Sequence, residues 1–385
     1  MLLLFLKFNS LKSNQLTHHR LNLIVLLLSL LILSGCRTKT SALRIGRIDS
    51  VMSRHPEFHG VLMLEREGMS HAAAYGFKDP VRGVGSDTAA IFELASVSKT
   101  LTSTVILQLV SEGRLSLEDS LRAFFPELPY PGISIRQMLS HTSGLPDYQA
   151  VMDAHWDKNR VAGNEECIGY LSRFHPPVLF KPGSGYAYSN TGYLILASVA
   201  EKLTGRPFAA LLKDRIFKPA GMSTAAMRTS EDKRVEGNFA YGFIRDSIGS
   251  GYAPADSFPS SNYTVWLANR RGPGRVSMKA SDLVRFARSF VQSQLLEPTL
   301  IAQAFEPAHA ASGELFEYGL GWELWNVPMD SSSDPVKWVG HLGDNPGYKT
   351  VLLLLPSGDR VMVLLSNNGY PEIERLAREL AAIGW

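Results

Sequence analysis

Ser96 and Lys99 have the spacing of a nucleophile and its general base. Residues three positions apart share one face of a helix, so the Lys99 amine can reach the Ser96 hydroxyl. Burial lowers the pKa of a lysine, and a neutral amine can accept the proton of an attacking serine. This pair therefore predicts nucleophilic catalysis. The same spacing recurs at Ser230 and Lys233, in the polar stretch TSEDKR, and we interpret that second pair as a chance match.

The segment around Ser96 can form the helix that this chemistry requires. Val97, Leu101, Val105 and Leu109 recur at helical spacing, and Gly113 is a typical stop, so we expect an amphipathic helix over 96–112. The backbone N–H of Ser96 would then face an incoming oxyanion at the helix N-terminus.

Two further motifs carry groups that such a nucleophile could use. Tyr188-Ser189-Asn190 stands just before a predicted helix over 191–204. A phenol with a lowered pKa can share in proton transfer, and an amide can hold a substrate carbonyl. His341-Leu342-Gly343 precedes a predicted strand, where Gly343 would let a substrate backbone approach closely.

Other functional classes lack their signatures in this chain. There is no Gly-x-Ser-x-Gly elbow, no His-Glu-x-x-His zinc motif and no phosphate-binding loop. The net charge of +3 equals the three basic residues of the acid-free leader 1–35, so the remaining chain is neutral and has no footprint for nucleic acid. We expect no metal and no cofactor. Cys167 has no neighbouring His or Gly-rich turn and is interpreted as a packed thiol.

In this order, the three motifs resemble the serine β-lactamase and penicillin-binding-protein superfamily. The nearer match is the branch of class C β-lactamases, D-Ala-D-Ala carboxypeptidases, D-aminopeptidases and related carboxylesterases. The resemblance runs from about residue 47 to 383. Its supporting stretches are FELASVSKTLTS (92–103), QMLSHTSGLPDY (137–148), FKPGSGYAYSNTGYLILASVAEKLTG (180–205), IFKPAGM (216–222), YGLGWEL (318–324) and GHLGDNPGYKT (340–350).

The resemblance implies a role for each motif. Ser96 would attack the substrate carbonyl and become acylated, while Lys99 and Tyr188 move its proton and then protonate the leaving group. Asn190 would orient the substrate. The backbone N–H groups of Ser96 and Asp344 would form the oxyanion hole, and water would release the acyl group.

The third motif departs from the family pattern at three positions. His341 stands where many relatives have Lys, so its attraction for a substrate carboxylate is weaker or depends on pH. Leu342 replaces a hydroxyl that helps relatives to bind that carboxylate. Asp344 puts a carboxylate beside the expected oxyanion donor, and its side chain must point away. The first two changes favour an esterase or another peptidase over a dedicated β-lactamase.

The implied fold class is α/β, with an antiparallel sheet flanked by helices, built from both chain ends, and a mostly helical inserted domain. We expect the α/β domain over 47–116 and 220–385 and the helical domain over 117–219. The predicted elements are strand pairs at 60–66 with 69–76 and at 348–355 with 360–366, helices over 207–217 and 371–383, and long loops over 228–275.

The N-terminus has the pattern of a bacterial lipoprotein signal peptide. The apolar run 23–33 is too short to span a membrane and fits a secretory core. Leu33-Ser34-Gly35-Cys36 resembles a lipobox, so we expect a signal peptide over 1–35, lipidation of Cys36 and a tether over 36–46. An uncleaved anchor and an ordinary secretory cleavage site remain alternatives. The expected location is the bacterial cell envelope, facing the periplasm from the outer membrane in a Gram-negative host.

The sequence thus predicts a lipid-anchored serine hydrolase that acts through an acyl-enzyme on ester, amide or D-amino-acid peptide bonds. Its partners would be a small-molecule or peptide substrate (an ester, a peptidoglycan peptide or a β-lactam) and the membrane, through Cys36. One alternative is a non-catalytic, penicillin-binding-like protein of the cell envelope. Another is a structural lipoprotein, which has only the leader in its favour.

Overall fold

The computed structural model describes residues 45–245, 251–329 and 334–385. The chain divides into two units, 1–54 with Trp385 and 55–384, and the sheet and the candidate site lie in the second unit. The predicted signal peptide, Cys36 and most of the predicted tether lie outside the described residues. Within those residues, no helix is both long and apolar enough to cross a membrane.

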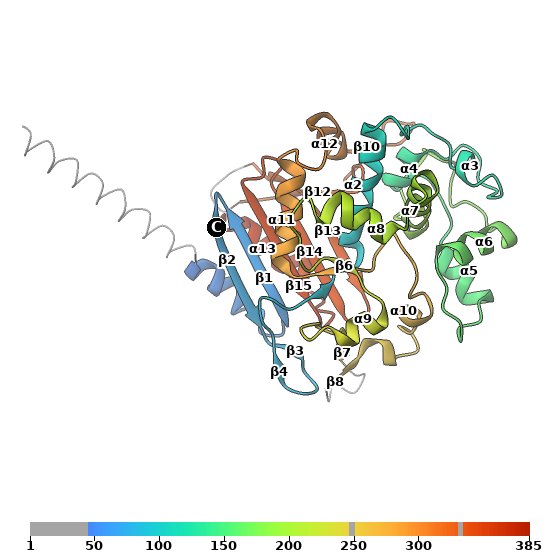
Figure 1. Ribbon diagram of the computed structural model, residues 1–385. Helices are drawn as coiled ribbons and strands as arrows, with labels where there is room; N and C mark the ends of the chain where they lie inside the picture. Colours follow the sequence, from blue (N-terminus) through green and yellow to red (C-terminus); the bar gives the residue numbers. More distant parts are fainter. Residues whose placement is uncertain (1–44, 246–250, 330–333) are drawn as a thin grey trace, which may run out of the picture. The chain divides into compact units, whose positions relative to one another are not determined.

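A six-stranded antiparallel sheet joins the two ends of the second unit (Figure 1). The hairpin from the start of the unit pairs with the last strand of the chain, with Gly60 opposite Ser366. In spatial order, the strands are β12 (Glu323–Val327), β13 (Val336–Asn345), β14 (Tyr348–Leu354), β15 (Arg360–Ser366), β1 (Gly60–Arg66) and β2 (Met69–Tyr75). The predicted sheet built from both chain ends is confirmed.

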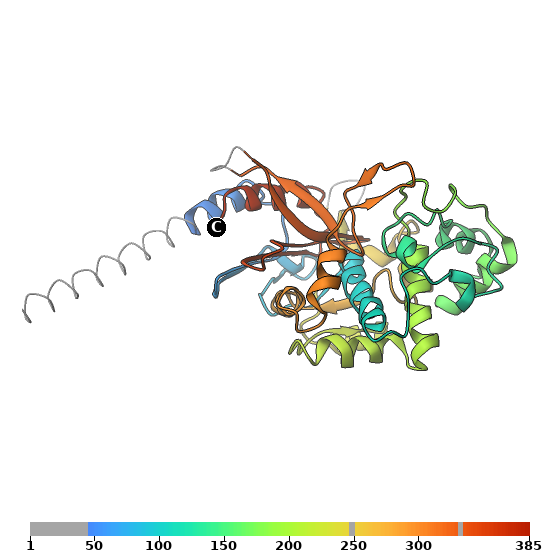
Figure 2. The same cartoon turned by 90° about the horizontal axis from the view of Figure 1, so that it is seen from above.

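Helices cover both faces of this sheet. Helix α11 (Ala280–Val291) packs on β15 and β1, and α13 (Ile373–Ala382) packs on β14, β15 and β12. Figure 2 shows these two helices on opposite sides of the sheet. Because both faces are covered, β14 and β15 are apolar almost throughout rather than alternating.

Helix α2 (Ser98–Ser111) links the sheet to the helical part of the unit. It contacts α7 (Asn190–Thr204) and α8 (Phe208–Leu212). Ten consecutive residues from its start are buried, so the amphipathic helix that we predicted is wrong in this respect. Its threonine side chains bond to backbone carbonyls instead: the Thr102 hydroxyl donates to the Gly272 carbonyl at 2.7 Å.

Helices of the predicted insertion gather on one side of the unit, where Figure 1 draws them in green. The predicted helix over 191–204 matches α7, whereas that over 207–217 is α8 followed by one π-helical turn (Lys213–Phe217). The boundaries of a separate helical domain remain a prediction. The other helices are α3 (Leu121–Phe124), α4 (Ile135–Leu139), α5 (Tyr148–His155), α6 (Asn164–Phe174), α9 (Ser230–Val235), α10 (Tyr263–Trp266) and α12 (Pro298–Ala304).

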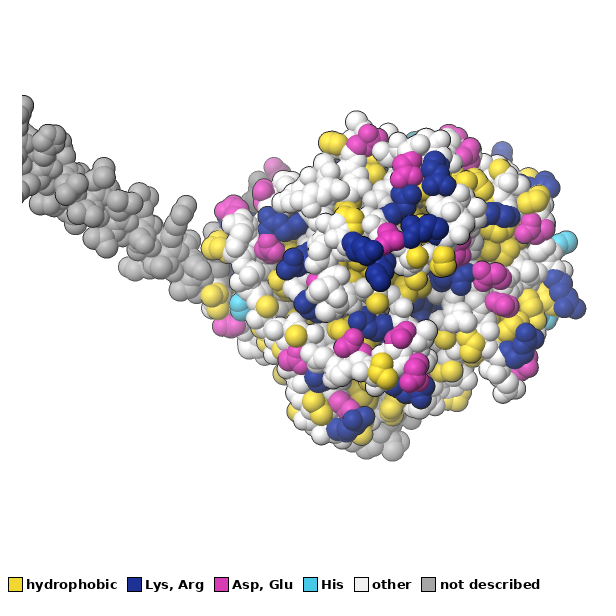
Figure 3. Space-filling view, in the orientation of Figure 1, with side chains coloured by type: hydrophobic (Ala, Val, Ile, Leu, Met, Phe, Trp, Pro, Cys, Tyr) yellow, Lys and Arg dark blue, Asp and Glu magenta, His cyan; other side chains and the backbone are white. Residues whose placement is uncertain are grey.

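Short strands connect these layers. A three-stranded sheet of β5 (Phe92–Glu93), β9 (Val276–Met278) and β6 (Ala226–Met227) lies directly before the nucleophile. Three two-stranded pairs complete the described fold: β3 (Phe77–Asp79) with β4 (Val84–Gly85), β7 (Phe243–Arg245) with β8 (Tyr252–Pro254), and β10 (Ala308–His309) with β11 (Leu315–Phe316). On the face in Figure 3, basic and acidic side chains are interspersed, as the near-neutral composition of this part predicts.

Candidate active site

Ser96 lies in a tight turn rather than in the helix itself. Strand β5 leads into a 3₁₀ turn over Ala95–Val97, and α2 begins only at Ser98, two residues later than we predicted. Ala95 has a φ of 48°, a left-handed conformation that costs an alanine on the order of 1 kcal/mol. The Leu94 N–H holds this turn by donating to the Val276 carbonyl at 2.9 Å. Ala95 and Val97 are therefore buried while Ser96 stays partly exposed.

Lys99 is fully buried and has three polar neighbours. Its Nζ lies 3.0 Å from Ser96 Oγ, 2.8 Å from Asn190 Oδ1 and 3.0 Å from the Pro273 carbonyl. Burial, and next the charge of Arg270, lower the pKa of Lys99 well below its usual value. A neutral amine has two hydrogens and one lone pair. Asn190 and Pro273 offer only acceptor oxygens, so the lone pair is directed at the Ser96 hydroxyl.

Tyr188 lies beside the same two residues. Lys99 Nζ is 4.7 Å from the centre of its ring, and its hydroxyl is hydrogen-bonded to Ser96. The residue is 44% exposed, yet burial of the hydroxyl raises the pKa of Tyr188 well above its usual value. Our expectation of a lowered pKa is therefore wrong. Tyr188 keeps its proton at neutral pH.

The first turn of α7 positions Asn190. The Ser189 side chain caps this helix by accepting from the Gly192 N–H at 3.1 Å, which fixes Asn190 as the first helical residue. The sequence Tyr-Ser-Asn thus places a phenol before the cap and an amide after it, both directed at Ser96 and Lys99.

His341 is completely buried on β13. Its Nδ1 lies 2.5 Å from the Leu342 carbonyl, and its Nε2 lies 2.9 Å from the Tyr318 hydroxyl. Since a carbonyl can only accept, Nδ1 carries the hydrogen and Nε2 accepts from Tyr318. Burial, with a smaller contribution from Lys99, lowers the pKa of His341 to about 3. This side chain is therefore neutral at pH 7 and offers no charge to a substrate carboxylate.

Gly343 lies against the nucleophile turn. A Cβ on Gly343 would lie 2.0 Å from Thr350 Oγ1 and 2.4 Å from the Leu94 carbonyl oxygen. We expected this glycine to admit a substrate backbone, but the backbone that approaches it is that of the chain before Ser96. Its absent side chain lets β13 pack beside the turn.

The side chain of Asp344 points away from the nucleophile. Its carboxylate is exposed and accepts from Lys349 Nζ at 2.5 Å, across the β13–β14 pair. Asp344 and Ser96 both line one small pocket of about 60 Å³, so the two backbone positions expected for the oxyanion hole converge on the same space.

The site also contains residues that the sequence analysis did not single out. His141 follows α4 with a φ of 60°, and its Nδ1 accepts from the Ser189 N–H at 3.0 Å. Its ring lies 4.4 Å from that of Tyr188. His141 stood inside one of the stretches that carried the resemblance. Arg270 came from the segment 228–275, read only as loops, and no local motif marks it.

In the described residues, neither a reactive thiol nor a metal-binding cluster forms a second catalytic centre. Burial raises the pKa of Cys167 to about 12, so this thiol stays protonated and packed. Among residues 45–245, 251–329 and 334–385, no three His, Cys, Asp or Glu side chains cluster so as to hold a metal ion.

Comparisons with known proteins agree with the resemblance. The family model described as Beta-lactamase matches residues 48–384. The chain is 34% identical over 314 residues to Penicillin-binding protein 4* of Bacillus subtilis (strain 168), covering 81% of this chain and 68% of that protein. It is 26% identical over 293 residues to a D-aminopeptidase of Cereibacter sphaeroides (strain KD131 / KCTC 12085), covering 75% of this chain but only about half, 53%, of that protein.

Solved structures share the fold. A penicillin-binding protein from Bacillus halodurans superposes with a TM-score of 0.72 at 21% identity, covering 87% of this chain and 97% of that one. A D-amino acid amidase from Ochrobactrum anthropi SV3 superposes with a TM-score of 0.69 at 23% identity, covering 87% and 96%. At these identities the likeness shows the fold alone, and it confirms the predicted α/β class.

Proposed function

The chain belongs to the beta-lactamase family of serine hydrolases, and we propose that it is a lipid-anchored member that cleaves ester, amide or D-amino-acid peptide bonds through an acyl-enzyme at Ser96. The observation that carries the proposal is the environment of Lys99. The two hydrogens of its neutral amine are donated to the oxygens of Asn190 and Pro273. Its lone pair is therefore directed at the Ser96 hydroxyl, whose Oγ lies 3.0 Å from Lys99 Nζ.

In the proposed acylation step, Ser96 Oγ attacks the substrate carbonyl while its proton passes to Lys99 Nζ. The backbone N–H groups of Ser96 and Asp344 would receive the oxyanion, a contribution of about 3–4 kcal/mol per donor in well-studied enzymes. Tyr188 keeps its proton at neutral pH and is hydrogen-bonded to Ser96, so it would donate that proton to the leaving group. The Lys99 ammonium then returns the proton to Tyr188.

Deacylation would use the same groups in reverse. A water molecule attacks the acyl carbon, the neutral Lys99 amine accepts its proton, and the Lys99 ammonium then gives that proton to Ser96 Oγ as the acyl bond breaks. Atoms balance with water as the only co-reactant, so the proposal requires no metal or cofactor.

The buried, neutral His341 supports esters and amides over penicillins as substrates. Together with Leu342, it leaves the third motif without the charge or hydroxyl that would hold a leaving-group carboxylate. One relative named above supports the same direction, since it is a D-aminopeptidase.

The proposal is tested by labelling the nucleophile. Residues 37–385 are treated with a fluorophosphonate, and the adduct is located by mass spectrometry of peptides, in parallel with turnover of p-nitrophenyl acetate. We expect the adduct on Ser96, and no label and no turnover in Ser96→Ala. Ser230→Ala, which removes the serine of the second Ser-x-x-Lys, is the matched control and should keep both. Full turnover by Ser96→Ala would overturn the proposal.

Anchoring through Cys36 is proposed from the leader sequence. Cells that express the full chain are grown with radiolabelled palmitate, and we expect label in the wild type and none in Cys36→Ala. Fractionation of the same cells tests the proposed envelope location, with the outer membrane expected in a Gram-negative host. An unlabelled wild-type chain that fractionates with membranes would instead support the uncleaved anchor.

A further inference from the structure

Arg270 is a buried cation beside Ser96 with no carboxylate partner in the part of the chain that the structure describes. It is only 8% exposed and lines the pocket of about 60 Å³ that also contains Ser96 and Asn190. Its polar contacts are neutral: Nη2 donates to Asn345 Oδ1 at 3.3 Å, and the guanidinium is hydrogen-bonded to the Tyr263 side chain, whose ring lies 5.2 Å away. A guanidinium has five N–H donors, so these two contacts leave donors for a ligand.

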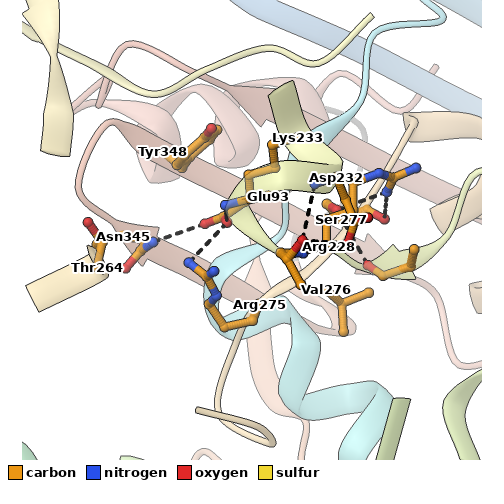
Figure 4. A network of polar contacts seen from close by, with 12 residues as sticks. Glu93, Arg228, Asp232, Lys233, Thr264, Arg275, Val276, Ser277, Asn345 and Tyr348 are labelled. Carbon is orange, nitrogen blue, oxygen red and sulfur yellow. Dashed lines mark hydrogen bonds and ion pairs between the residues drawn. The ribbon is translucent and has the colours of Figure 1, made fainter. Parts of the chain in front are cut away.

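The charge around Arg270 is positive rather than balanced. Glu93 is a buried carboxylate that Lys233 contacts directly and Arg275 contacts at 3.5 Å (Figure 4). Asn345 extends this network, since its Nδ2 donates to Glu93 at 3.2 Å and its Oδ1 accepts from Arg270. Three cations thus share one carboxylate.

No other acid on the small pocket compensates this excess. Asp344 is the one acidic side chain on its lining, and it is paired with Lys349. Asp147, another acid within electrostatic range of Arg270, does not line the pocket and accepts from the Gln149 N–H at 3.0 Å. A buried charge without a partner is costly, and such a charge at the wall of a pocket is stabilised when a ligand of opposite charge binds.

The lining of the pocket fixes which part of a substrate would meet Arg270. Tyr148, Gln149 and Tyr263 lie on it with Ser96, whereas neither Tyr188 nor His341 does. The leaving group must depart toward Tyr188, the proton donor of the proposed mechanism. The acyl part of the substrate, which stays on Ser96, therefore lies on the side of Arg270.

We propose that Arg270 binds a carboxylate carried by the acyl part of the substrate, so that the preferred substrates are esters or amides whose acyl chain ends in a free acid. This inference rests on the proposed function, because it assigns the acyl side from the roles of Ser96 and Tyr188. A second pocket of about 490 Å³ shares Arg275 and Asn345 with the first, which leaves room for a longer acyl chain.

The test compares esters that differ only in acyl charge. Mono-p-nitrophenyl adipate carries a terminal carboxylate, its methyl ester carries none, and both release the same chromophore. We expect the wild type to hydrolyse the acid with a kcat/KM at least about tenfold above that of the methyl ester, the size of one charge-assisted hydrogen bond. In Arg270→Gln this ratio should fall to about one, and Arg270→Lys should retain a preference for the acid.

Arg271→Gln is the matched control. Arg271 is the neighbouring arginine, but it is paired with Glu165 and Glu201 and does not line the pocket, so its loss should leave the ratio at the wild-type value. Fluorophosphonate titration counts the active sites in each preparation. The p-nitrophenyl ester of a trimethylammonium-capped acyl chain adds a measurement on the wild type alone, and we expect it to be the poorest of the three substrates.

Two failures are distinguishable. If the wild type hydrolyses the methyl ester but shows no preference for the acid, or if Arg270→Gln keeps the preference, the assignment of Arg270 is overturned while the serine hydrolase stands. If no ester is hydrolysed and Ser96 takes no label, the proposed function itself has failed.

Discussion

The Tyr318 hydroxyl donates to Nε2 of His341 across 2.9 Å and so completes the hydrogen bonding of a completely buried imidazole. The opposite nitrogen, Nδ1, donates to the Leu342 carbonyl, and burial keeps the ring neutral at pH 7. Position 341, which often carries a lysine in the family, thus carries here a neutral side chain that is completely buried on β13.

This neutrality predicts how stability depends on pH. The pKa of His341 is 6.5 when exposed and about 3 when folded, so between these values the unfolded chain binds more protons. The free energy of unfolding therefore falls as the pH falls below about 6.5, by up to about 1.4 kcal/mol per pH unit for one group. Urea unfolding from pH 7.5 to 4.5 measures this slope, which should be shallower in His341→Gln. An equal slope would contradict the assignment.

The charge at Arg270 predicts a shift in the pH–rate profile. Arg270 is the second cause, after burial, of the lowered pKa of Lys99, whereas Glu323 raises that pKa. Activity requires the neutral amine, so kcat/KM of a neutral ester rises with pH through the pKa of Lys99. We expect this acid limb at higher pH in Arg270→Gln and at lower pH in Glu323→Gln. Shifts in the same direction, or none, would show that Lys99 is not the titrating base.

Tyr188→Phe should lower kcat by about a hundredfold, the usual contribution of a positioned acid, because the leaving group loses its proton donor. The loss should be largest for amides and small for p-nitrophenyl esters, whose leaving group needs no proton. Tyr186→Phe is the control, since Tyr186 lies two residues away and its ring contacts Phe316 and Tyr318. Equal losses for amides and esters would argue against proton donation by Tyr188.

Gly343→Ala should damage both stability and catalysis. The new Cβ would overlap Thr350 and the Leu94 carbonyl, an overpacking of about 1–3 kcal/mol that displaces the turn holding Ser96. We expect a lower melting temperature and slower fluorophosphonate labelling. Gly169→Ala on α6, where nothing lies within 4 Å of a Cβ, should keep both at least at the wild-type level. Normal labelling in Gly343→Ala would contradict the packing role.

The parts of the fold and of the candidate site that depend on a local sequence pattern could be predicted from the sequence. Lys99 lies within hydrogen-bonding distance of both Ser96 and Asn190 because the starts of α2 and α7 face each other. The strand pairs at both ends were predictable from their apolar runs and turns, and the helix 191–204 from Ser189 and Gly205 at its two ends.

Other features depend on tertiary contacts that no local window contains. The pKa of Tyr188 rises because its hydroxyl is buried, and that burial requires the folded site as a whole. Arg270 has no motif because its position comes from the backbone of Gly272 and Pro273, which packs against α2 and α7. Helix α2 has an apolar stripe in sequence, but neighbours on every side bury it completely at its start.

The pairing of β1 with β15 also determines when this protein can fold. Gly60 and Ser366 are neighbours in space, yet almost the whole second unit separates them along the chain. During synthesis, the β1–β2 hairpin has no partner on one edge until Arg360–Ser366 has left the ribosome. An open strand edge of this kind invites aggregation. A truncation before β15 would leave two such edges, on β14 and on β1, and would separate β13 and β14, which pack against the turn at Ser96, from the hairpin β1–β2.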